Sequence, residues 1–186
     1  QLPAGITAVN GGNYEWNTAA WTNGLPGPGD AVFINDVAKV VIIRGEPAVA
    51  QGIRMGNVVP QISKLQLEGS SLSVDFIVIG DAADSNAIFT MAGGELSVED
   101  SGPLDFEIGN PENAATQDSI SLATFAAGQA ELGDIRFNLR AKRRSRLVVF
   151  GVLPSVSAES VRFETAGEKE WHPGERREKG DRRDRH

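Results

Sequence analysis

The sequence predicts an all-β protein, a parallel β-solenoid whose chain winds into coils of about 24 residues. Three observations lead to this prediction. Short runs of Val, Ile, Leu and Phe alternate with polar residues, which is typical of strands. Glycine followed by Asn or Asp recurs after such runs at a nearly constant spacing. A second, independent landmark keeps the same spacing, so coincidence is a poor explanation.

The predicted strands are four to eight residues long and are bounded by Gly, Asn, Asp or Pro. They cover residues 31–34, 39–43, 52–55, 64–68, 71–74, 76–79, 88–91, 95–98, 105–108, 135–139, 146–150 and 160–164. Helical periodicity is missing almost everywhere. The one Ala-rich helix candidate, LATFAAGQAELG at 122–133, is interrupted by Gly128.

The first landmark is an aliphatic residue, any residue, an aliphatic residue or Met, then Gly and Asn or Asp. It occurs as IRMGN (53–57), IVIGD (77–81), FEIGN (106–110) and, more weakly, AELGD (130–134), with glycines 24, 29 and 24 residues apart. The second landmark aligns KLQLEGSSLSV (64–74) with IFTMAGGELSV (88–98), again 24 residues apart. A coil of this length accommodates three short strands and three turns. The five extra residues in the middle step predict a loop insertion near 99–103.

A β-sandwich or jelly roll, with ordinary turns between its strands, is the alternative fold. The solenoid interpretation divides the chain into four parts. They are an N-terminal cap with the first strand (1–34), the repeats (35–139), a basic loop with terminal strands forming a last hairpin or coil (140–167), and a charged tail (168–186).

Charge is distributed unevenly along the chain, whose net charge is −7. Residues 1–139 carry 17 acidic and 5 basic side chains, whereas residues 140–186 carry 8 acidic and 13 basic ones. An acidic body repels phosphate, which argues against nucleic-acid binding.

The chain has no cysteine and no apolar run long enough to span a membrane. We expect Gln1 to be the processed end of a secreted protein whose signal peptide has been removed.

A Trp-rich segment precedes the repeats. Its residues Trp16, Trp21, Pro26, Asp30 and Val32 form the pattern W-x4-W-x4-P-x3-D-x-V, and the units IGD (79–81) and FTMAGGEL (89–96) follow. Together these motifs resemble secreted β-helix proteins of planctomycetes and verrucomicrobia, of the autotransporter-associated and PEP-CTERM-linked type. The resemblance covers roughly residues 13–135. It implies export and a right-handed parallel β-helix, and it implies no activity.

The aromatic residues of this segment have two interpretations. Trp16 and Trp21 can cover the first coil, whose core and strand edges are otherwise open. Alternatively, Tyr14, Trp16 and Trp21 form a carbohydrate-binding platform, because a Trp face suits the C–H groups of a sugar ring. We favour the cap.

A basic segment lies between two predicted strands near the C-terminus. Its basic residues are Arg140, Lys142, Arg143, Arg144 and Arg146. A solvated loop is the simpler interpretation. The alternative is a contact with the acidic body of a neighbouring subunit.

The tail 168–186, with 13 charged residues of 19, is expected to be solvated or to tether subunits.

The sequence offers few residues that could form a catalytic or metal-binding site. Both histidines lie in the tail, so the body offers neither a Ser-His-Asp triad nor a multi-histidine metal site. A polysaccharide lyase on a β-helix needs Ca²⁺-binding carboxylates and an Arg or Lys base on one face, but the body has few basic residues and four coils make a short groove. Paired carboxylates for glycoside hydrolysis are present, although an acidic cluster is more often a solvated face. We therefore expect no enzyme. Asp81, Asp84 and Asn86 could bind a structural Ca²⁺ ion, although Asx-turn capping is the simpler interpretation.

Two functions from different classes remain. The first is an extracellular structural protein that associates with itself as a homo-oligomer, in a filament, sheath or cell-surface layer. The second is a carbohydrate-binding module or adhesin that binds extracellular polysaccharide. We prefer the structural function, because the repeat dominates the sequence and a solenoid has strand edges at its ends.

Overall fold

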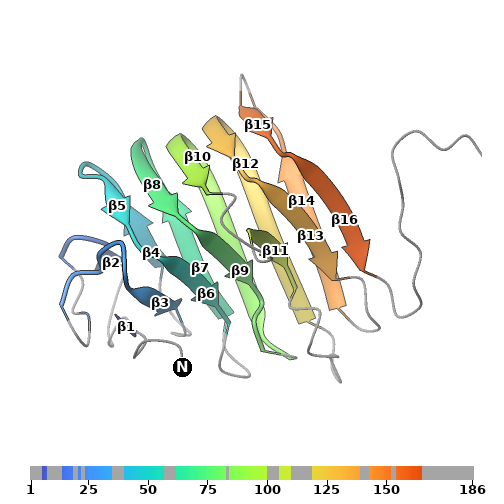
Figure 1. Cartoon of the computed structure of the whole chain (residues 1–186), viewed down its shortest axis with the longest axis horizontal. Helices are drawn as coiled ribbons and strands as arrows, with labels where there is room; N and C mark the ends of the chain where they lie inside the picture. The colour runs from blue at the N-terminus through green and yellow to red at the C-terminus, as the bar shows by residue number, and fades with distance from the viewer. Residues whose placement is uncertain are drawn as a thin grey trace, which may run out of the picture.

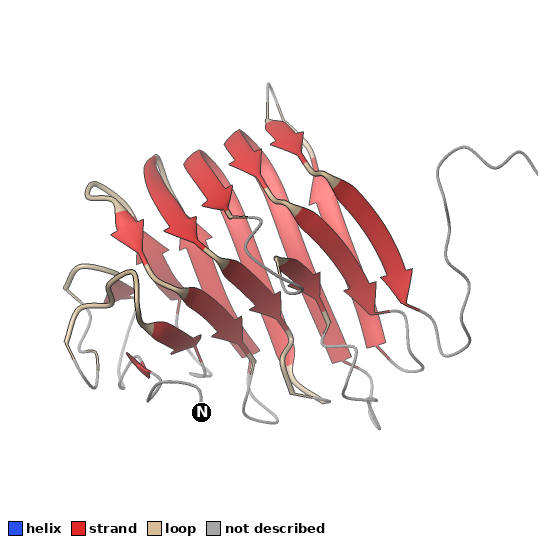
Figure 2. Ribbon diagram, viewed as in Figure 1, coloured by secondary structure: helices blue, strands red, loops and turns tan. Residues whose placement is uncertain are grey.

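A computed structural model describes residues 6–7, 14–18, 21, 24–34, 40–56, 62–82, 84–99, 105–109, 119–138, 143–151 and 154–164. Regular structure in these residues consists of strands (Figure 2). None of the described residues belongs to a helix of the length and apolar character that crossing a membrane requires. The predicted tail 168–186 lies outside the described residues.

The strands form two sheets of parallel strands (Figure 1). The seven-stranded sheet runs in the order β1 (Ile6–Thr7), β3 (Ala31–Ile34), β6 (Gly52–Met55), β9 (Phe76–Ile79), β11 (Phe106–Ile108), β13 (Asp134–Asn138) and β16 (Ser160–Glu164). The nine-stranded sheet contains β2 (Tyr14–Glu15), β4 (Val40–Ile43), β7 (Ile62–Leu67), β10 (Asn86–Val98), β12 (Ser119–Glu131) and β14 (Arg143–Val149), flanked by β5 (Ala48–Val49), β8 (Ser70–Val74) and β15 (Ser155–Ser157).

Each coil crosses three faces. The seven-stranded sheet is the first face. The second and third faces share the other sheet, because β10 pairs with β7 along its first half and with β8 along its second half. All pairs are parallel and join successive coils, so the predicted β-solenoid is confirmed and the sandwich alternative is wrong.

The pairing register measures the coil length directly. Ile53 lies opposite Ile77, which is 24 residues later, and Ile77 lies opposite Phe106, which is 29 residues later. The extra five residues fall between Val98, which is level with Val74, and Phe106. The predicted insertion near 99–103 is therefore confirmed, although residues 100–104 themselves lie outside the described residues.

Two details of the predicted pattern are wrong. Ile108 lies opposite Phe137, so the position that matches Gly109 is Asn138 and not Gly133. Gly133 instead occupies the corner level with Glu99, and the AELGD match is accidental. The prediction also left out a strand: β12 pairs with β10, with a shift of register near Ala127, and its small Ala123 and Ala130 face the core.

The core is a set of side-chain columns that run along the stack. Inward residues of successive coils lie opposite one another, as in the series Ile53, Ile77, Phe106 and Ile135. Phe89, Phe106 and Phe125 meet inside, with ring centroids 5.8–6.2 Å apart, and all three are fully buried. Close packing of this kind favours one register of each coil on the next.

Glycines make the bends between faces. Gly56, Gly80 and Gly109 end three strands of the first face with φ of 73°, 86° and 82°, a region that suits Gly. Gly94 bends β10 with φ of 94°, and a Cβ there would lie 1.9 Å from the carbonyl oxygen of Ser70 in the preceding coil. The bend therefore depends on close approach of two backbones.

We predict that Gly94→Ala destabilises the protein by about 3 kcal/mol, from backbone strain and a backbone clash. Gly29→Ala is the matched control, because Gly29 has an ordinary φ and open space around its Cβ position. Urea unfolding followed by far-UV circular dichroism measures both. Equal unfolding midpoints for the two variants would contradict the role of Gly94.

Candidate self-association surface

The two tryptophans of the N-terminal segment lie inside the first coils. Trp16 is 1% exposed and Trp21 is 8% exposed. Their rings meet edge to face with centroids 4.9 Å apart, and the Trp21 indole N–H donates to the Trp16 carbonyl at 2.8 Å. Neither indole presents a face to a sugar in solvent, so the platform interpretation lacks support and the arrangement is that of a cap. The side chain of Tyr14 lies outside the described residues.

The residues proposed for Ca²⁺ have other partners. Asp81 accepts a 2.8 Å hydrogen bond from Arg54, and both side chains are mostly buried. The side-chain oxygen of Asn86 accepts from the backbone N–H of Ile120 at 2.8 Å. Asp84 also takes part in an interaction. Within the described residues no three His, Cys, Asp or Glu side chains gather to bind a metal. The contacts of Asp81 and Asn86 thus join neighbouring coils, which is a structural role that neither the Ca²⁺ site nor Asx-turn capping predicts.

The basic segment is partly a strand and not only a loop. Arg140 and Lys142 lie outside the described residues, whereas Arg143 begins β14. Arg144 and Arg146 are exposed on β14, opposite Ile120 and Leu122 of β12. Backbone pairing with β12 thus holds these two guanidinium groups on the outer surface of the terminal coil.

The terminal coil, made of β14, β15 and β16, ends both sheets. Its strands lie in the positions of further solenoid strands, so they form a last coil and not the alternative hairpin (Figure 1). Among the described strands, β14 and β15 pair only with β12, and β16 pairs only with β13. Each strand therefore presents one edge of backbone N–H and C=O groups that no described strand covers.

The columns of inward-facing core side chains end at the surface of the terminal coil. Val149, Val161 and Phe163 lie opposite Phe125, Ile135 and Phe137, which are 0%, 4% and 9% exposed. The terminal residues are themselves 47%, 38% and 38% exposed. Phe163 stacks on Phe137 with centroids 5.0 Å apart and an interplanar angle of 15°. Apolar side chains in core positions thus contact solvent, beside strand edges that no described strand covers.

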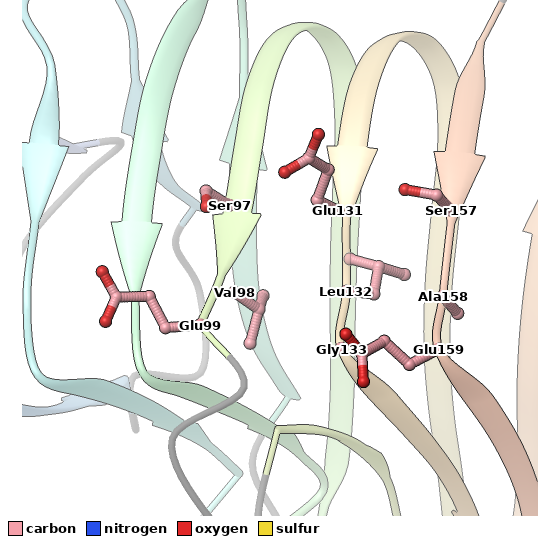
Figure 3. A pocket seen from close by; sticks show the side chains of 9 residues that line it. All are labelled: Ser97, Val98, Glu99, Glu131, Leu132, Gly133, Ser157, Ala158 and Glu159. Atoms are coloured by element: carbon pink, nitrogen blue, oxygen red, sulfur yellow. The ribbon is translucent and has the colours of Figure 1, made fainter.

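An acidic hollow of about 410 Å³ lies beside this coil (Figure 3). Glu99, Glu131 and Glu159 line it, with Gly133 between Glu99 and Glu159 in the corner column. A Cβ at Gly133 would lie 2.8 Å from a carboxylate oxygen of the buried Asp105, so a larger residue does not fit there without a shift. The three carboxylates are exposed to solvent, so the hollow is a patch of negative charge next to β15.

Two other carboxylates are buried, and each contacts a residue of the next coil. Asp105 accepts from the backbone N–H of Asp134 at 2.8 Å, and Glu107 lies 3.8 Å from Arg136. Both side chains are at most 2% exposed. Their contacts join neighbouring coils, which gives them a structural explanation.

Comparison with known proteins finds no relative. No protein-family model, curated protein or solved structure matches this chain.

We predict that Trp16→Ala destabilises the protein by about 3–5 kcal/mol, because it leaves a large cavity under the first coil. Leu25→Ala is the control at the same end, since Leu25 is 57% exposed, and its effect should stay within about 0.5 kcal/mol. Urea unfolding measures both. A Trp16→Ala variant as stable as Leu25→Ala would contradict the cap.

Proposed function

We propose that the protein is a structural subunit that associates with itself through its terminal coil. The observation that carries the proposal is the exposure of Val149, Val161 and Phe163, which occupy core columns but lie at an open end of both sheets. A second chain that adds to these strands would extend the sheets and cover the columns together.

Two physical contributions favour such an association. Edge strands β14 and β16 have seven and five residues, long enough for several backbone hydrogen bonds with a new strand. Covering the exposed apolar side chains stabilises the complex by roughly 25 cal/mol per Å² of apolar surface removed from water. Monomeric proteins usually protect edges of this length, which makes a partner the simpler explanation.

The proposed setting is extracellular, in a filament, sheath or surface layer. This part of the proposal is supported by the resemblance of residues 13–135 to secreted β-helix proteins. We do not propose carbohydrate binding, because Trp16 and Trp21, the residues on which it depended, are buried.

We predict that Val161→Lys weakens self-association, with a dissociation constant raised about 30-fold, because it places a charge in the apolar contact. Ile62→Lys is a matched control: Ile62 is also β-branched and 38% exposed, but it lies on β7 in the middle of the stack. Light scattering coupled to size-exclusion chromatography, across a range of protein concentrations, gives the mass of each variant.

The unchanged protein and Ile62→Lys should increase in mass with concentration, whereas Val161→Lys should remain monomeric over the same range. An unchanged protein that stays monomeric at high concentration and at varied ionic strength would refute the proposed function. Equal association by both variants would place the contact elsewhere.

A further inference from the structure

We infer that the partner is a second copy of this chain, joined tail to tail across a two-fold axis with β16 antiparallel to its counterpart. This inference depends on the proposed self-association and specifies its geometry. The unit of assembly is then a symmetric pair with its two Trp-capped ends pointing outward. The alternative is head-to-tail addition, which would continue without limit.

The two ends of the described solenoid differ in the length of their edge strands and in the exposure of their core. At the N-terminal end the edge strands β1 and β2 have two residues each, and Trp16 and Trp21 seal the core. At the other end β14 and β16 have seven and five residues, and the core columns are open. Strand edges of this length and apolar surface match another terminal coil better than they match the short, sealed N-terminal end.

The sequence of β16 is self-complementary under a two-fold axis. When two copies of this strand pair antiparallel about Arg162, Val161 of each lies opposite Phe163 of the other. Both residues point to the inner side and both are 38% exposed, so the pairing covers the open columns from both copies. Phe163 is already held against Phe137, which lowers the entropy lost on binding.

The same two-fold axis also brings opposite charges on the flanking strands together. A rotation that reverses β16 also exchanges the second and third faces, so β14 of one copy comes over β15 of the other. Exposed Arg144 and Arg146 then lie on the side of Glu131 and Glu159 of the second copy. Opposite charges attract across this junction.

One repulsion opposes the arrangement. Arg162 meets its own counterpart at the axis, although each guanidinium group lies 3.5 Å from Asp134 of its own chain and is 60% exposed. Solvent and this carboxylate screen the two positive charges.

Disulfide trapping tests the geometry, because the chain has no cysteine. Arg162→Cys places a single thiol at the axis, and mild oxidation should convert most of this variant into a covalent dimer on non-reducing electrophoresis. Leu25→Cys, at the opposite end and 57% exposed, controls for random collision and should stay monomeric. An equimolar mixture of the two variants should give no heterodimer above the collision level.

The outcomes separate this inference from the function on which it depends. Cross-linking only between the two variants in the mixture would show head-to-tail association. That result overturns the two-fold pair and leaves the self-association intact. An unchanged protein that associates in light scattering while Arg162→Cys fails to cross-link also overturns the pair. An unchanged protein that never associates overturns both.

Charge reversal provides an independent test. The double variant Arg144→Glu and Arg146→Glu should raise the dissociation constant of the pair about tenfold. Adding Glu131→Arg and Glu159→Arg to the same chain should restore most of the affinity, because both copies then carry the reversed pattern. A head-to-tail contact brings neither glutamate near the arginines, so a second pair of reversals that fails to restore affinity contradicts the two-fold arrangement.

Discussion

Parallel pairing of each coil with the next is the interaction on which the whole structure depends. A strand in this fold finds its hydrogen-bond partners only in the neighbouring coils, and its inward side chain packs on those above and below it. Stacking therefore satisfies the backbone and forms the core in one step. It also means that the structure is incomplete wherever the stack stops, because the last coil has a partner on one side only.

The two ends of the described stack meet this problem differently. The first coils shorten their edge strands and fill the core with two indoles that contact each other edge to face. The terminal coil keeps long strands and leaves Val149, Val161 and Phe163 at the surface. We propose that the Trp pair seals one end within the chain and that a partner covers the other.

Much of the fold could be predicted because repetition is written into the sequence. Val, Ile and Leu recur inward with period two, and Gly80 and Gly109 mark a bend that few other residues tolerate. Prediction was wrong where coils compensate for one another. The strand β12 was missed because its second half, residues 126–131, is rich in Ala and lacks β-branched residues. Its small Ala123 lies opposite the large, buried Phe89 of the preceding coil. Gly133 matches the repeat in spacing, yet the register assigns it to a different corner.

The candidate surface was predictable only in part. The basic residues of β14 are visible in the sequence, and so is the capping role of the Trp pair. The exposure of Phe163 is not visible, because β16 alternates like any internal strand and differs only in what lies beside it.

Hydrogen–deuterium exchange of the protein at low and high concentration tests the central claim most directly. Amides on the outer edge of β14, β15 and β16, which do not donate to β12 or β13, should exchange rapidly in dilute solution and become protected as the concentration rises, while exchange in β6, β9 and β11 stays unchanged. Protection of these outer-edge amides that is independent of concentration would show that this end is already covered within one chain, and would contradict the account.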